Sequence, residues 1–267
     1  MPGIDRAALA ARLPAIMREA GELALRTFRR EALRSWLKGH SSPVSEADIA
    51  VNEFLLERLQ VEAPNAGWLS EETEDEGSRM QASLVWIVDP IDGTRAYIEG
   101  RTDWSISVAL AENGRPVIAA LYAPATDDLF AAVAGAGGTH NGAPLKANAG
   151  DTLDGARVAG PRSTLARLTA LRPQIIAEPK VHSLALRFAR VAQGTLDIAF
   201  AARNSHDWDL AAADLLVHEA GGALTDFAGQ TLTYNRPEPV HGALLAAGHA
   251  RHAGLVSLVR DRQREFA

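Results

Sequence analysis

The chain has 267 residues, of which 47% are hydrophobic and 22% charged, as in an ordinary globular protein with a large core. Lys and Arg number 27 against 33 Asp and Glu, and the formal charge of −6 argues against binding to a nucleic-acid backbone. The absence of cysteine excludes disulfides, thiolate catalysis and zinc–sulfur sites. No run of 18 uncharged apolar residues occurs, and the first residues lack the apolar core of a signal peptide. We therefore expect a cytoplasmic protein that does not span a membrane.

Hydrophobic periodicity predicts a change of architecture in the middle of the chain. Amphipathic helices are predicted at 5–30 and 45–61, and an antiparallel meander at 104–134 is followed by a glycine-rich turn region at 135–142. From about residue 150, short strands alternate with helices: we expect strands at 157–159, 174–177, 196–200 and 243–247 and helices at 183–192, 208–220 and 249–264. This pattern predicts an α/β fold of two sub-domains, 1–148 (α+β) and 149–267 (α/β), with helices layered against sheets.

The most informative motif is Leu-Val-Trp-Ile-Val-Asp-Pro-Ile-Asp-Gly-Thr at residues 84–94. An apolar run typical of a strand ends at Asp89, and Asp92 follows three residues later. Two such carboxylates offer the hard oxygen ligands that Mg2+ prefers, and backbone N–H groups of a glycine-bearing turn suit phosphate. Pro90 removes a donor, so the strand cannot simply continue through the acids. The alternative is an ordinary turn, because Asp, Pro and Gly are also common turn residues.

Three further acids are candidates, and each has a structural alternative. Glu71 opens an acidic run that is also typical of a solvated loop. Asp209 stands in the first turn of a predicted helix, where an acid often serves the helix dipole or a cap. Asp48 follows Ser45 in a capping-box pattern. With Asp89 and Asp92, Glu71 and Asp209 form an all-carboxylate set that suits Mg2+ and is poor for zinc or copper.

These motifs stand in a distinctive order: Glu71-Glu72, then Trp86-Ile-Val-Asp-Pro-Ile-Asp-Gly-Thr94, then Trp208-Asp209-Leu-Ala-Ala-Ala with Glu219-Ala-Gly-Gly222. In this order and spacing the chain closely resembles the inositol monophosphatase family. That superfamily of lithium-sensitive, Mg2+-dependent phosphatases includes the 3'(2'),5'-bisphosphate nucleotidases. The resemblance runs from Ser42-Pro-Val-Ser-Glu-Ala-Asp48 to the last predicted strand. It implies a layered αβαβα sandwich of the inositol monophosphatase and fructose-1,6-bisphosphatase type, a homodimer, and hydrolysis of a small phosphorylated metabolite.

The resemblance also implies a role for each matching residue. Two or three Mg2+ ions would be held by the side chains of Glu71, Asp89, Asp92 and Asp209 and by the backbone carbonyl of Ile91. The attacking water would be held and activated by Glu72 and Thr94, with Asp48 in the outer water network. The phosphate would bind the backbone N–H groups of Gly93 and Thr94.

The residues expected near the substrate favour a bisphosphate. Inositol-specific relatives carry an acid seven positions before the Trp-Asp aspartate, where this chain has Ala202 followed by Arg203, and the usual Gly-Ser is replaced by Lys180-Val-His182-Ser183. A second phosphate suits cations, and we expect substrate contacts from Lys180, His182, Ser183 and Arg203. Surface charges are the alternative for Lys180 and Arg203. The favoured substrate is adenosine 3',5'-bisphosphate; the alternatives are inositol 1-phosphate, histidinol phosphate, or a catalytically inactive metal- or polyanion-binding protein.

Overall fold

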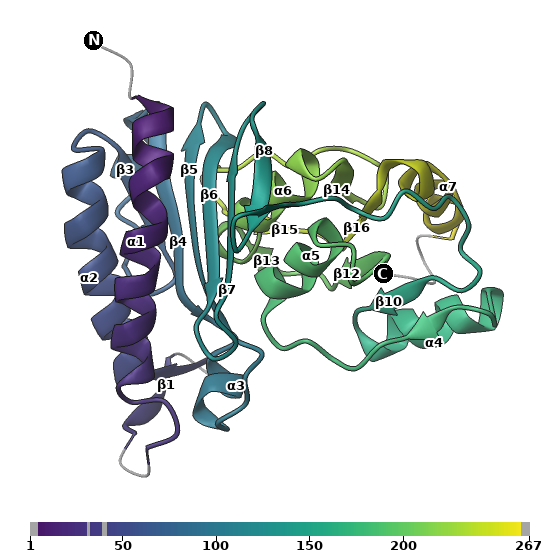
Figure 1. Cartoon of the computed structure of the whole chain (residues 1–267), viewed down its shortest axis with the longest axis horizontal. Coiled ribbons are helices and arrows are strands. Elements are labelled where there is room, and N and C mark those ends of the chain that lie inside the picture. Colours follow the sequence, from purple (N-terminus) through teal and green to yellow (C-terminus); the bar gives the residue numbers. More distant parts are fainter. Residues whose placement is uncertain (1–4, 31–32, 39–41, 263–267) are drawn as a thin grey trace.

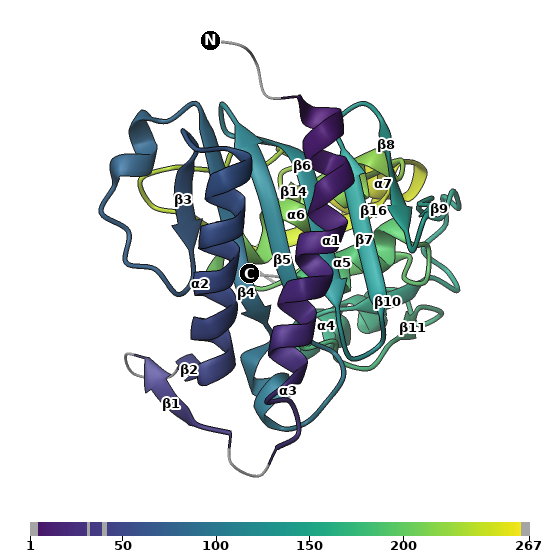
Figure 2. The same cartoon turned by 60° about the vertical axis from the view of Figure 1, so that its left-hand side comes forward.

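Helices and sheets alternate in five layers in the computed structural model, which describes residues 5–30, 33–38 and 42–262 (Figure 1). Helices α1 (Arg6–Leu25) and α2 (Glu46–Glu62) cover the outer face of the first sheet (Figure 2). Helices α5 (Leu184–Ala192) and α6 (Asp207–Glu219) lie between the two sheets. Helices α4 (Arg162–Leu171) and α7 (His249–Arg260) pack on the far face of the second sheet. The expected αβαβα sandwich is confirmed.

The first sheet has seven strands in sequence order: β3 (Gly67–Ser70), β4 (Leu84–Asp92), β5 (Ser105–Glu112), β6 (Arg115–Ala123), β7 (Asp128–Val133), β8 (Gly137–His140) and β9 (Ala143–Pro144). Only β3 and β4 are parallel to each other. The predicted meander is confirmed as β5 to β7. The expected turn at 135–142 is partly wrong, because β8 turns back after Gly135 (φ 75°) and pairs with β7. A glycine with positive φ permits that tight reversal.

Strand β4 is apolar from Leu84 to Val88 because both faces of its sheet are covered, and it continues through Asp89 to Asp92. Val85 and Ile87 point into the core shared with α5 and α6, whereas Trp86 and Val88 point towards α1 and α2. The indole N–H of Trp86 donates to the carbonyl of Leu59 at 3.1 Å, which fixes α2 against the strand. The strand that leads to the two aspartates is therefore rigidly held.

The second sheet has the order β11-β10-β12-β16-β14. Its strands are β10 (Arg157–Ala159), β11 (Ile176–Ala177), β12 (Ile198–Ala201), β14 (Gly222–Asp226) and β16 (Leu244–Gly248). Two short ladders complete the structure: β1 (Ser35–Lys38) with β2 (Ser42–Ser45), and β13 (Ser205–His206) with β15 (Val240–His241). The predicted strands and helices of this half are present with ends shifted by a few residues. The helix predicted to residue 264 ends at Arg260, and 263–264 lie outside the described residues.

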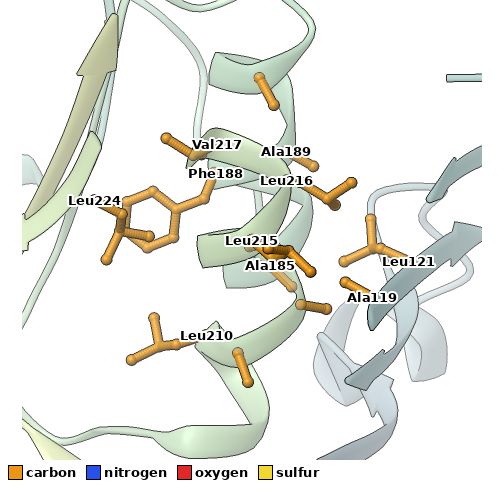
Figure 3. Close-up of a cluster of buried hydrophobic side chains, with 14 of the residues drawn as sticks. Ala119, Leu121, Ala185, Phe188, Ala189, Leu210, Leu215, Leu216, Val217 and Leu224 are labelled. Carbon is orange, nitrogen blue, oxygen red and sulfur yellow. The ribbon is translucent and has the colours of Figure 1, made fainter. Parts of the chain in front are cut away.

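A single hydrophobic core joins the two sheets through α5 and α6. In Figure 3, Leu121 of β6 and Leu224 of β14 lie on opposite sides of these helices, with Phe188 and Leu216 between them. Residues before and after 148 thus share one core, and the proposed division at that point stays a prediction. Among the described helices, none has the length and apolar character needed to cross a bilayer.

Candidate metal centre

The acidic side chains gather where β3 and β4 end. Because these strands are parallel and Ser70 pairs with Val88, the next residues, Glu71 and Asp89, emerge at the same edge of the sheet. The pairing of β4 with β5 shifts register between Asp89 and Asp92, and this irregularity places Asp92 beside Asp89. Asp209 arrives from the first turn of α6. One ligand oxygen from each of the three aspartates lies within 4.8 Å of the others.

Asp92 is held by the start of α5. Its Oδ2 accepts hydrogen bonds from the hydroxyl of Ser183 at 2.6 Å and from the backbone N–H of Ala185 at 2.7 Å. Ser183, expected near the substrate, therefore holds a carboxylate of the centre, and its Oγ is also 2.9 Å from that of Ser105. The Gly93 backbone (φ 94°) passes so close that a Cβ would lie 3.1 Å from the Ser183 nitrogen. Only glycine allows this approach.

In Asp89 and Asp209 as well, one carboxylate oxygen accepts a hydrogen bond from a backbone N–H group. Asp89 Oδ1 accepts from the backbone N–H of Ile91 at 3.0 Å, and its buried Oδ2 has no partner among the described residues. Asp209 Oδ2 accepts from the backbone N–H of His206 at 2.7 Å. The capping alternative for Asp209 is thus correct, and the same side chain still joins the cluster.

Crowded, buried carboxylates repel one another. Burial, followed by the charge of Asp209, raises the pKa of Glu71 to about 8. Burial and the charge of Asp92 raise the pKa of Asp209 to about 8, and burial with the charge of Glu71 raises the pKa of Asp89 well above its ordinary value. A divalent cation would compensate this charge, and the unpartnered buried oxygen of Asp89 offers it a ligand. The donor set therefore fits Mg2+.

Thr94, the first residue of α3 (Thr94–Ile98), connects the turn to Asp48. Its Oγ1 lies 3.0 Å from Asp48 Oδ1 and 3.0 Å from the carbonyl of Ile91, so its single proton has two acceptors within reach. Asp48 Oδ2 accepts from the backbone N–H and hydroxyl of Ser45, as the capping-box alternative predicts. Burial raises the pKa of Asp48 to about 6. Asp48 is thus both a helix cap and the partner of Thr94.

Sequence reasoning missed Lys38. This residue ends β1, and its Nζ lies 3.2 Å from Glu72 Oε2 while donating to the backbone carbonyl of Glu71. The Glu72 side chain is only 4% exposed, so the lysine partly neutralises a nearly buried carboxylate. No periodicity or motif marks Lys38, and only the pairing of β1 with β2 brings it to the site.

The structure does not bring the four residues expected near the substrate together at one place. The His182 ring is bonded to Asp103, with 2.7 Å between Nδ1 and Oδ2. Lys180 lines a cavity that Arg203 does not reach, and Arg203 is exposed in the turn between β12 and β13. Within the described ranges, neither cation forms an ion pair.

Asn235, in the loop between β14 and β15, connects the segment that follows Glu71 to the helix that carries Asp209. Buried Asp207, at the start of α6, bonds His241 Nε2 at 2.7 Å and accepts from the backbone N–H of Asn235 at 2.7 Å. The side-chain oxygen of Asn235 accepts from Arg79 Nη1 at 2.6 Å. Arg79 is buried in the 3-10 turn η1 (Ser78–Gln81), and its Nη2 also lies 2.7 Å from Asp75 Oδ2. The connection after Glu71 and the helix of Asp209 are therefore anchored to the same place, which the sequence did not reveal.

Comparison with known proteins agrees with this geometry. The sequence model of the inositol monophosphatase family matches residues 6–264. An inositol-1-monophosphatase of Rhizobium meliloti is 35% identical over 221 residues, covering 79% of this chain and 82% of that protein. The 3'(2'),5'-bisphosphate nucleotidase CysQ of Aggregatibacter actinomycetemcomitans is 32% identical over 237 residues, covering 84% and 86%.

Solved structures show the same fold. The extragenic suppressor protein suhB of Bartonella henselae superposes with a TM-score of 0.82 at 26% identity, covering 95% of this chain and 98% of that one. The IMPase of Thermotoga maritima gives a TM-score of 0.81 at 24% identity, covering 96% and 98%. The layered arrangement of helices and sheets is thus common to all three chains.

Proposed function

The chain belongs to the inositol monophosphatase family, a family of Mg2+-dependent phosphatases, and from this we propose that the cluster of Asp89, Asp92 and Asp209 is its catalytic centre. The observation that carries the proposal is the convergence of three aspartates whose second oxygens are bonded to backbone or side-chain donors. Such preorganised oxygens hold a hard cation without rearrangement.

The proposed ligands are the side chains of Glu71, Asp89, Asp92 and Asp209 and the carbonyl oxygen of Ile91. When bound there, Mg2+ supplies a positive charge that offsets the phosphate oxygens and acidifies water. Two or three ions are expected by family resemblance. Phosphate monoesters hydrolyse very slowly without catalysis because their anionic oxygens repel a nucleophile, so this charge is the main requirement.

The remaining residues orient the water and the phosphate. The Thr94 hydroxyl accepts a hydrogen bond from the attacking water and donates its own proton to Asp48 Oδ1, 3.0 Å away. Glu72 accepts the second hydrogen bond from that water, and Lys38 orients the Glu72 carboxylate. The backbone N–H groups of Gly93 and Thr94 donate to the phosphate. Asp48 remains mostly ionised at neutral pH, because its pKa is raised only to about 6, and it can accept the proton.

Within this reaction, we favour a 3'(2'),5'-bisphosphate nucleotide as the substrate. Support comes from the cation at Arg203 beside Ala202, and from the 32% identity to a relative named as such a nucleotidase. Inositol 1-phosphate is the second candidate, because a relative with 35% identity is named an inositol-1-monophosphatase. The expected homodimer and cytoplasmic location belong to the same proposal.

One screen tests both the metal-dependent reaction and the preference for a bisphosphate substrate. Phosphate release is measured with adenosine 3',5'-bisphosphate, inositol 1-phosphate, fructose 1,6-bisphosphate and histidinol phosphate, each with Mg2+ and after chelation. We expect the highest kcat/KM for the adenosine bisphosphate and no release without metal. Preference for inositol 1-phosphate or histidinol phosphate would overturn the substrate alone. Turnover that survives exhaustive chelation would overturn the mechanism, and no release from any compound would favour a binding protein.

A further inference from the structure

A cavity of about 510 Å3 lies apart from the metal centre, and none of the proposed metal ligands lines it. Its wall combines the loop between α3 and β5, the start of β7, strand β10, the segment after β11 and the end of α5. This volume is ordinary for a small-molecule site. Four of its lining residues are cationic: Arg101, Arg157, Lys180 and Arg190.

The acids of the wall are already committed to partners. Asp103 bonds Arg101 at 3.1 Å, Glu178 bonds Arg157 at 2.7 Å and Asp128 bonds His140 at 2.8 Å. Over the residues that the structure describes, the side chains of Lys180 and Arg190 form no hydrogen bond or ion pair. The wall carries four cationic and three acidic side chains, so its formal charge is +1 in a chain of net charge −6, and a concave surface concentrates this positive potential.

We propose that this cavity is a second binding site, separate from the metal centre, for a small phosphate-bearing anion held by Lys180 and Arg190. Ammonium and guanidinium groups together match the oxygens of a phosphate. Thr102, Gln193 and Thr195 in the same wall add polar surface.

The site is connected to the metal centre by a short stretch of backbone. Lys180 precedes Ser183 by three residues, and the Ser183 hydroxyl donates to Asp92 at 2.6 Å. The intervening His182 is bonded to Asp103 through both its backbone N–H, at 2.8 Å, and its ring. The wall of the cavity and the residue that positions Asp92 therefore belong to the same short stretch of backbone.

The test uses inorganic phosphate and the full-length, metal-free protein in excess chelator, so that no bound metal can itself bind the phosphate. Isothermal titration calorimetry should show saturable binding of one phosphate per chain. Lys180→Gln with Arg190→Gln should weaken this binding roughly ten- to a hundredfold, since charge-assisted contacts are lost. The pair Lys180→Arg with Arg190→Lys, which keeps both charges, should retain most of it.

A control pair that removes the same number of positive charges tests whether phosphate binds in the cavity or responds only to the overall charge of the protein. Arg167 and Arg260 are exposed on the outer helices α4 and α7, so Arg167→Gln with Arg260→Gln should leave the phosphate affinity unchanged. Mn2+ binding, followed by electron paramagnetic resonance, verifies that each variant keeps its metal centre. Absence of saturable binding to the metal-free wild type, or an equal loss in the control pair, would overturn the proposal. No turnover is measured, so failure here is distinct from failure of the proposed phosphatase reaction.

Discussion

Asp92 shows how one side chain serves both the fold and the proposed reaction. One of its oxygens accepts from the first turn of α5, and the side chain also belongs to the aspartate cluster. Burial raises its pKa, while the bonds from Ser183 and Ala185 oppose the rise. These two bonds thus favour the ionised carboxylate that a metal ligand requires.

Replacement of Asp92 by Asn should separate these two tasks. The amide oxygen can still accept from α5, but the ligand charge is lost, so we expect kcat to fall roughly a thousandfold or more. Steady-state kinetics and Mn2+ titration measure the effect, with circular dichroism as the control for folding. A near wild-type rate with unchanged Mg2+ dependence would mean that residues 89–94 form only a turn.

Thr94 offers a finer test, because its hydroxyl is the only part of the side chain proposed to act. Thr94→Ala should lower kcat by about a hundredfold, the range of a lost proton-transfer partner, with little change in KM or in Mn2+ affinity. Thr94→Ser keeps the hydroxyl and should retain most of the activity. If Ser and Ala variants lose activity equally, the packing of the methyl group matters and the proton relay does not.

Replacement of Arg203 tests the proposed preference for a substrate with a second phosphate. Arg203→Gln should reduce kcat/KM for adenosine 3',5'-bisphosphate roughly ten- to a hundredfold, because a charge-assisted contact to phosphate is worth about 1.5–3 kcal/mol. The loss should be small for inositol 1-phosphate, which lacks a second phosphate. Equal losses on both substrates would assign Arg203 to the scaffold or to the scissile phosphate.

At the scale of elements, helix α6 contributes the proposed metal ligand Asp209. It lies between the sheets, presents Asp209 from its first turn, and is anchored through Asp207 to Asn235 and His241. Arg79 reaches the same segment from the connection between β3 and β4. The distance between Glu71 and Asp209 is therefore controlled by residues that touch neither metal nor substrate.

Arg79→Met should loosen this anchor. The buried guanidinium loses its bonds to Asn235 and to the partly exposed carboxylate of Asp75, which should cost about 2 kcal/mol of unfolding free energy. It should also weaken Mn2+ binding, since Glu71 and Asp209 are no longer held together. Urea unfolding and Mn2+ titration measure the two effects. Arg101→Met, which removes an ion pair whose arginine side chain is 47% exposed, is the control and should cost less than about 1 kcal/mol. Unchanged metal affinity in Arg79→Met would leave the arginine a purely structural role.

At the scale of the molecule, the centre makes the stability of the metal-free protein depend on pH. The pKa of Glu71 is about 8 in the folded protein against an ordinary value of 4.5, and that of Asp209 is about 8 against 3.8. Between pH 4 and 8 the folded state therefore binds more protons than the unfolded state. The stability that these two groups contribute in their protonated form is fully present near pH 4 and is lost as the pH rises through 8.

Urea unfolding in chelator should accordingly give a lower free energy at pH 8 than at pH 5.5. Excess Mg2+ should reverse the difference, because the cation replaces the protons. Glu71→Gln removes one of the titrating groups and should flatten the pH dependence. A metal-free protein that grows more stable from pH 5.5 to pH 8 would contradict the proposed crowding of carboxylates.

The sequence by itself determined the local features of this protein. Helix α2 begins at its Ser45 cap as predicted, and the meander β5 to β7 follows from alternation and turns, because such signals lie within a few neighbouring residues. The aspartates of residues 84–94 were recognised for the same reason. Helix α4 and strand β14 were missed, because a short segment with little periodicity is stabilised mainly by its neighbours.

Only the tertiary structure decided how the site is held. Ser183 lies 91 residues from Asp92, and Arg79 lies 156 residues from Asn235, yet each pair is hydrogen-bonded. Lys38 reaches Glu72 through a hairpin that no motif marks. These contacts depend on which faces of α5, α6 and the two sheets meet when the core closes. A residue's type restricts the bonds it can form, but its partner is chosen by the packing of elements that are distant in sequence.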